Sequence, residues 1–348
     1  MKNHLAVTGI LFFLYSCSST NLMSLSVTEP APVSIAPSMK SAVVVNRSRA
    51  ADESKTVDAI HRTLSLETKD LQADGAKASV RGLTDELLKD GRFASVKSLD
   101  NLDLRSYGAG IFPTYLSWDT VEKICGENHA DVLFSLELFD AAAKVGVGGA
   151  PALLSNPLGA VAALEQPFSM NTRIRTGWRI YDPATRNILD EFIIYRDLVS
   201  QGHGVGPVSV SNSLLVRKEA VNKAGIDAGQ EYGLRIVPYS VRVSRWYYVR
   251  GNSSFIVARR MAQSGDWDDA AKLWQQQTES HSRKVAGRAC YNMAIISEIN
   301  GDLNAALDWS KKAYEMYNNR LALSYTNILR DRQNNNEVLK SQTEITGP

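Results

Sequence analysis

The feature that most restricts the fold of this chain is an internal repeat near its C-terminus. The pattern Ala-x6-Gly-Asp-x3-Ala begins at Ala258 and begins again at Ala294. Two helical turns span about seven residues, so each of these alanines is expected on a helix that ends at the glycine. Glycine accepts the left-handed backbone that ends many helices, and the last alanine lets a second helix pack closely. The repeat therefore predicts two consecutive helical hairpins.

The same pattern resembles the tetratricopeptide repeat, a helix–turn–helix unit of about 34 residues, although the spacing here is longer. The resemblance implies an all-α array of about two to two and a half repeats over residues 251–335, which would present a groove to a protein or peptide partner. In this register the residues that face the groove are Arg259, Arg288, Tyr291 and Glu298. A generic helical bundle that happens to repeat is the alternative.

The residues before the repeat alternate between strand-like and helix-like patterns. Ala42–Val45 is an apolar, β-branched run typical of a strand buried on both faces, and Val132–Phe139 predicts a second strand. Helical patterns cover Val80–Leu88 and Ser117–Cys125. This alternation favours an α+β or α/β domain over residues 41–250. The predicted fold class is therefore an N-terminal α/β domain followed by an all-α, tetratricopeptide-like helical array.

Later in this domain, residues 170–195 predict a β-hairpin with its turn at Asp182-Pro183. A helix over 213–232 follows, and its regularly spaced alanines and glycines would let it lie close on a sheet. Arginines near Trp178 and Trp246 form either a cationic aromatic surface or the solvated face of the sheet.

The first seventeen residues predict a bacterial lipoprotein signal. Lys2 precedes the apolar run Leu5–Tyr15, which is too short to span a bilayer as a helix but long enough for a signal peptide. Leu14–Cys17 resembles a lipobox, which implies a signal peptide of residues 1–16 and lipidation of Cys17. Residues 17–40 would then be a lipidated tether leading into an early strand. The alternatives are an ordinary secretory signal with an incidental cysteine, or a buried first helix.

A second apolar stretch, residues 145–164, carries no charged side chain. Its several glycines and prolines make it a poor helix, which favours an apolar loop or hairpin tip. A tip that touches a membrane or a partner is the alternative.

The sequence offers no recognisable chemistry for a reaction. Its five histidines have no metal-ligand spacing, and a buried, inert thiol is expected for Cys290. With a net charge of +2, the chain lacks the strong positive field that nucleic-acid binding needs. We therefore expect no catalytic residue, no metal, no cofactor and no nucleic-acid partner, and predict that the protein is not an enzyme.

Most of the chain resembles uncharacterised Bacteroidetes lipoproteins that join an N-terminal domain of unknown function to tetratricopeptide-like helices. The blocks that carry this resemblance are Leu14–Cys17, Thr176–Pro183, Arg245–Tyr248 and Gly265–Ala270. It implies an outer-membrane lipoprotein of the cell envelope that faces the periplasm and acts as an interaction or scaffold protein, with a polar tail over 336–348. The alternative is an envelope glycan-binding protein or hydrolase that uses the aromatic, arginine-rich sheet, with Trp178 and Trp246 as contacts.

Overall fold

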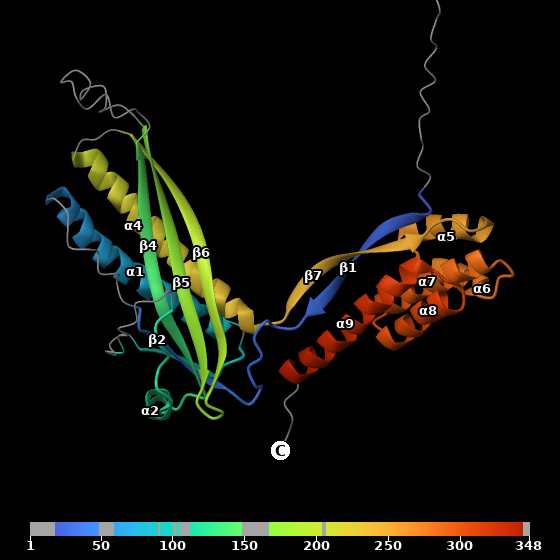
Figure 1. Cartoon of the computed structure of the whole chain (residues 1–348), viewed down its shortest axis with the longest axis horizontal. Coiled ribbons are helices and arrows are strands. Elements are labelled where there is room, and N and C mark those ends of the chain that lie inside the picture. Colours follow the sequence, from blue (N-terminus) through green and yellow to red (C-terminus); the bar gives the residue numbers. More distant parts are fainter. Residues whose placement is uncertain are drawn as a thin grey trace, which may run out of the picture. The chain divides into compact units, whose positions relative to one another are not determined.

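The computed structural model describes residues 18–48, 59–89, 91–99, 102, 104, 112–147, 167–203 and 207–343. The chain divides into two compact units (Figure 1). The α/β unit comprises Pro30–Pro238 with Leu339–Pro348, and the helical unit comprises Met1–Glu29 with Tyr239–Val338. The predicted order of an α/β region followed by an all-helical region is confirmed.

The α/β unit is built on a five-stranded sheet in the order β3-β2-β4-β5-β6. Strand β2, the second in this order, runs parallel to both of its neighbours, whereas β5 runs antiparallel to both β4 and β6. The strands are β2 (Ser41–Asn46), β3 (Ser95–Leu99), β4 (Val132–Val147), β5 (Pro167–Asp182) and β6 (Asn187–His203). The hairpin predicted from residues 170–195 is confirmed, since Asp182 caps its turn by accepting bonds from the backbone N–H groups of Ala184 and Thr185.

Two long helices, α1 (Ala59–Lys89) and α4 (Pro207–Gly233), cover one face of this sheet (Figure 1). The helix predicted over 213–232 is confirmed, but its glycines face α1 rather than the sheet. A Cβ atom at Gly225 or Gly229 would collide with the α1 backbone carbonyls of Gly75 and Ser79. The small residues therefore allow close contact between the two helices.

The other face of the sheet packs partly on α2 (Trp118–Asn128). Ser117 caps α2, because its side chain accepts a bond from the N–H of Thr120. Strand β2 separates the two cores: Val44 contacts the α1/α4 side, while Val43 and Val45 contact the α2 side. The prediction that this strand is buried on both faces is confirmed.

The helical unit begins with a two-stranded antiparallel ribbon of β1 (Thr20–Glu29) and β7 (Tyr239–Tyr248). This arrangement differs from the sequence prediction in two ways. Residues 17–40 were expected to be a tether with a strand later in it, yet β1 begins at Thr20. The predicted domain boundary at residue 250 also places β7 with the sheet domain, whereas β7 pairs with β1 in the helical unit. The pairing of β1 with β7 is not visible in local sequence patterns, because the two strands are over 200 residues apart.

Five helices follow the ribbon: α5 (Ser253–Ser264), α6 (Trp267–Gln277), α7 (Arg283–Ile299), α8 (Leu303–Glu315) and α9 (Arg320–Thr343). A 3-10 turn, η2 (Leu234–Ile236), precedes β7. The predicted polar tail over 336–348 is helical as far as Thr343.

The two copies of the sequence repeat adopt the same local structure. Gly265 and Gly301 end α5 and α7 with φ values of 96° and 81°. The following aspartates precede α6 and α8, and the alanines of both copies are fully buried. The predicted pair of helical hairpins is confirmed.

None of the described helices combines the length and the apolar composition needed to cross a bilayer. The signal segment and Cys17 lie outside the described residues, as do residues 148–164 of the apolar stretch.

Candidate functional site

The helical unit encloses a buried carboxylate, Glu298 on α7, whose side chain has no exposed surface. Arg245 of β7 donates one bond to each carboxylate oxygen, both at 2.8 Å. From α9, the hydroxyl of Tyr325 and Nη1 of Arg332 each donate a bond of 2.6 Å. The cluster thus joins β7, α7 and α9 through one negative and two positive groups.

Hydrogen bonding sets the charge state of this cluster. Burial alone would raise the pKa of Glu298, but the bonds from Arg245, Tyr325 and Arg332 outweigh burial and lower it. Burial and the charge of Glu298 raise the pKa of Tyr325. At neutral pH Glu298 is therefore ionised and Tyr325 remains a donor.

The four residues predicted to face a groove fall into two pairs. Tyr291 and Glu298 are buried within the helical core, where Tyr291 packs between the rings of Tyr248 and Tyr325. Arg259 and Arg288 are partly exposed. Arg288 lies over the Tyr248 ring at 4.9 Å and donates a 2.6 Å bond to the carbonyl of Arg250. Tyr291 and Glu298 thus stabilise the unit from inside, and only the two arginines offer a surface.

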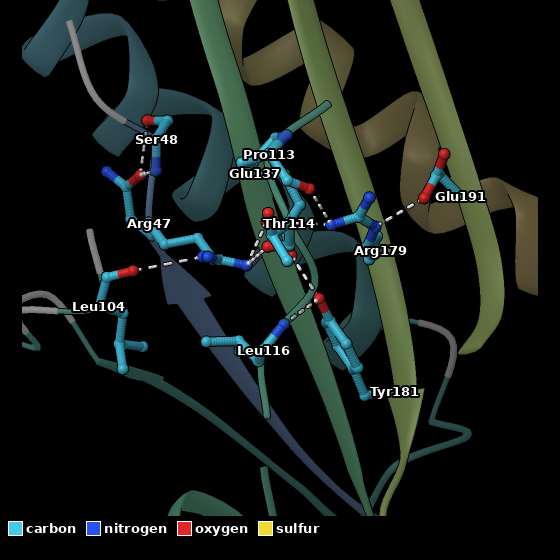
Figure 2. A network of polar contacts seen from close by, with 11 residues as sticks. Arg47, Ser48, Leu104, Pro113, Thr114, Leu116, Glu137, Arg179, Tyr181 and Glu191 are labelled. Atoms are coloured by element: carbon cyan, nitrogen blue, oxygen red, sulfur yellow. Dashed lines mark hydrogen bonds and ion pairs between the residues drawn. The ribbon is translucent and has the colours of Figure 1, made fainter. Parts of the chain in front are cut away.

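The α/β unit contains a second buried carboxylate, Glu137 of β4 (Figure 2). Arg47 Nη1 lies 2.8 Å from Oε2, and the hydroxyl of Tyr181 donates a 2.8 Å bond to Oε1. Arg179 Nη1 is farther away, at 3.7 Å, and its Nε bonds Glu191 at 2.7 Å. Glu137 thus has one close guanidinium contact and one distant one.

This second cluster fastens the segment before α2 to the sheet (Figure 2). Arg47 Nη1 donates to the carbonyl of Thr114 at 2.9 Å, and Arg179 Nη1 donates to that of Pro113 at 2.7 Å. The Tyr181 hydroxyl accepts a 3.2 Å bond from the N–H of Leu116. Residues 113–116 are therefore held by the same groups that surround Glu137.

Burial dominates the titration of this second cluster. Removal of the carboxylate from water raises the pKa of Glu137, although Arg47, Tyr181 and Arg179 act in the opposite direction. The pKa of Tyr181 rises to about 12, mainly through burial and then through the charge of Glu137. Tyr181 therefore stays protonated and keeps donating to the carboxylate.

Glu137 lies in a β-bulge of β4. The register of β4 on β5 shifts between Leu136 and Leu138, leaving Glu137 as the extra residue. Before the bulge, Phe134 and Leu136 face the α1/α4 core; after it, Phe139 and Ala141 do so. This change in the parity of buried apolar residues is the sequence signal that could have located the cluster.

A shallow hollow of about 510 Å³ opens beside α2, lined mainly by Ser38, Met39, Glu122, Cys125, Asp131 and Pro183. Its groups are already engaged. Partial burial alone would raise the pKa of Asp131. The hydrogen bonds that its carboxylate accepts from the Ser41 hydroxyl and from the N–H groups of Lys40 and Ser41 lower this pKa instead. Burial raises the pKa of the Cys125 thiol to about 12, which leaves it un-ionised at neutral pH.

Other chemistry-bearing residues also lie in the core. Cys290 is fully buried, as predicted, and burial raises its pKa to about 11. Within the described ranges, no group of three His, Cys, Asp or Glu side chains could bind a metal ion together.

Trp178, a proposed glycan contact, is buried and stacks on Tyr232 with ring centroids 5.2 Å apart. Trp246 is instead 51% exposed.

Two family models match the sequence. Residues 39–248 match a domain of unknown function, DUF8603, and residues 257–331 match a second domain of unknown function, DUF6340. This pairing agrees with the expected combination of an N-terminal domain of unknown function and a separate C-terminal domain. No match is found among curated proteins.

The solved structures that are similar to this chain include those of two bacterial proteins. A PelC dodecamer from Paraburkholderia phytofirmans is 13% identical, with a TM-score of 0.23, and the match covers 60% of this chain and 97% of that one. A neuraminyllactose-binding hemagglutinin homolog from Helicobacter pylori is 10% identical, with a TM-score of 0.28, and the match covers 60% and 94% of the two chains. At these values neither similarity defines the fold or the function of this chain.

Proposed function

The chain belongs to the DUF8603 family, and we propose that this member is a lipid-anchored interaction protein of the cell envelope. In this proposal its helical unit, built from tetratricopeptide-like hairpins, binds a protein or peptide partner. The lipobox-like Leu14–Cys17 supports the envelope location and the lipid anchor. The resemblance to Bacteroidetes lipoproteins supports an outer-membrane position facing the periplasm.

The observation that carries partner binding is the uncovered side of the last helix. Helix α9 buries Ala322, Tyr325 and Leu329 against the preceding helices, yet Leu321 is 39% and Ile328 is 40% exposed. These two residues are seven positions apart, about two helical turns, so they lie on the same side of α9.

In a helical array, the next repeat packs on the outer side of the last helix, and a terminal helix that faces only water is normally polar there. An apolar pair at this position favours a further helix or an apolar peptide supplied by a partner. Exposed, partly apolar surfaces of this kind are typical of interaction sites.

Photo-crosslinking in intact cells tests the proposal. A crosslinker that replaces Ser324, between the two apolar residues, should capture a defined protein, which mass spectrometry would identify. The double variant Leu321→Glu/Ile328→Glu should abolish this capture by placing charge in the interface.

Leu323 provides a matched control. It is also apolar and 45% exposed on α9, but it lies on a different side of the helix. Leu323→Glu should leave capture intact, with both variants folded by circular dichroism. Equal loss with both variants, or recovery of the same partner in a pull-down with protein that lacks residues 252–348, would contradict the proposal.

The lipid anchor has its own test. Wild-type protein should incorporate labelled fatty acid and fractionate with membranes, and Cys17→Ser should abolish both. Unchanged labelling and fractionation in the variant would remove the envelope location from the proposal.

A further inference from the structure

We propose that the end of the β1–β7 ribbon nearest residue 17 contacts a phospholipid bilayer surface through Leu22 and Trp246. This inference rests on the proposed lipid anchor at Cys17 and extends it, because it assigns the protein a second membrane contact. We call Leu22 and Trp246 the ribbon-end pair.

The ribbon-end pair is an apolar patch on the outward side of the ribbon. Leu22 and Trp246 are directly opposite each other in the strand register, and they are 47% and 51% exposed. Side chains alternate between the two faces of a strand, so the neighbouring Met23, Arg245 and Tyr247 point to the other face. Those three contact the helical unit, which leaves the pair facing outward.

The position of Cys17 limits how far this pair can be from a membrane. Leu22 is five residues after Cys17, and a fully extended chain spans at most about 18 Å over that length. The first strand begins at Thr20, so little slack separates the ribbon from residue 17. A lipid at Cys17 therefore keeps the ribbon end within about 18 Å of the headgroup layer, where tryptophan is enriched in membrane proteins.

The chemistry around the pair suits a phospholipid headgroup. The rest of the outward face carries hydroxyl side chains and one cation: Ser24, Ser26, Thr28, Ser240, Arg242 and Ser244. It contains no acidic residue. Arg242 is exposed and forms no ion pair within the described part of the chain. Beyond the ribbon end, Arg250 is exposed and adjoins Arg288. These cations favour the phosphates of anionic lipids.

Site-specific fluorescence tests this contact in lipidated, full-chain protein reconstituted into vesicles of phosphatidylethanolamine and phosphatidylglycerol. A single cysteine replaces Leu22, or Thr28 at the far end of the same strand face, and each carries an environment-sensitive label. The two positions are about 20 Å apart along the strand. Cys125 and Cys290 are buried with raised pKa values, so the label is directed to the introduced thiol.

A bilayer contact predicts a blue-shifted label at residue 22 that a lipid-soluble quencher reaches, and neither effect at residue 28. Equal behaviour at both positions in lipidated protein would overturn the ribbon contact and leave the anchor standing. Protein that carries no lipid at Cys17 would overturn the anchor and this inference together. A label at residue 22 that is covered in cells but not in vesicles would show that a protein or glycan occupies the site, which also overturns the inference.

Vesicle sedimentation of the full chain carrying Cys17→Ser measures how strongly the ribbon-end pair binds the bilayer when the lipid anchor is absent. The added change Leu22→Ser/Trp246→Ser should weaken partitioning on the order of tenfold, as expected for the loss of two half-exposed apolar side chains. Tyr239→Ser is the matched control, because this residue is 48% exposed at the opposite end of β7. Equal loss in the control would contradict the inference.

Discussion

Glu137 in the α/β unit and Glu298 in the helical unit have similar surroundings, but their pKa values are shifted in opposite directions. Each carboxylate is buried and accepts hydrogen bonds from tyrosine and arginine side chains. The pKa of Glu137 is nevertheless raised, whereas that of Glu298 is lowered. Glu298 accepts three guanidinium bonds of 2.8 Å or less, and Glu137 accepts one. The number of charge-assisted bonds, rather than burial alone, decides the direction.

The arginines of the two clusters also differ, in whether they have hydrogen-bond acceptors other than the buried carboxylate. Arg47 and Arg179 have other acceptors, which are the backbone carbonyls before α2 and the carboxylate of Glu191. Arg245 and Arg332 both donate to Glu298, and Arg245 also reaches the backbone carbonyl of Ser244. Loss of the carboxylate charge should therefore be costlier in the helical unit.

Glu298→Gln should have the largest effect. The amide keeps the shape of the side chain but leaves the buried guanidinium of Arg245 and the partly buried one of Arg332 without a counter-charge, so the free energy of unfolding should fall by about 3–5 kcal/mol. Urea unfolding followed by hydrogen exchange would locate the loss in the helical unit. Glu315→Gln, at an exposed position on α8, is the control and should change stability by less than about 0.5 kcal/mol. A similar small change for Glu298→Gln would refute the proposed role of its charge.

Glu137→Gln should cost less, about 1–2 kcal/mol, because Arg47 and Arg179 retain their other acceptors. Faster hydrogen exchange should be confined to residues 112–117 and the start of α2, which this cluster holds. A loss as large as that of Glu298→Gln would show that the two clusters are energetically equivalent and break the comparison.

The two clusters should also respond oppositely to pH. The lowered pKa of Glu298 contributes stability that is present above the unfolded carboxyl pKa and is lost as pH falls through the folded value. The raised pKa of Glu137 contributes stability that is present below the unfolded pKa and is lost as pH rises through the folded value. Unfolding of wild type and each Gln variant across the acid range would isolate both contributions. Parallel pH profiles would contradict the assigned directions.

An exposed ion pair should show the smallest effect. Arg173 and Asp197 bond at 2.7 Å on β5 and β6, but their side chains are 64% and 51% exposed. Arg173→Ala should lower the free energy of unfolding far less than either carboxylate variant, because water screens this pair, and added salt should weaken the difference further. A loss of stability comparable to that of Glu298→Gln would mean that solvent exposure does not decide how much an ion pair contributes to the stability of this protein.

The interaction residues illustrate how far sequence reasoning reaches. The repeat correctly placed helices α5 to α8 and their glycine-ended turns, because those features depend on neighbouring residues. It did not reveal that Tyr291 and Glu298 are buried, since their environment includes β7 and α9. Leu321 and Ile328 were also missed, because exposure at the end of an array depends on which helix covers which side.

The sequence by itself determined the local elements of this protein: the apolar run of β2, the turn at Asp182, and the glycine ends of α5 and α7. These depend on backbone preferences and on side-chain periodicity within a few residues. The tertiary structure alone decided that β1 pairs with β7, that Arg47 and Tyr181 bond Glu137, and that Arg245 bonds Glu298. Such contacts join residues that are distant in the sequence, and a local sequence pattern does not indicate which distant residue will be the partner.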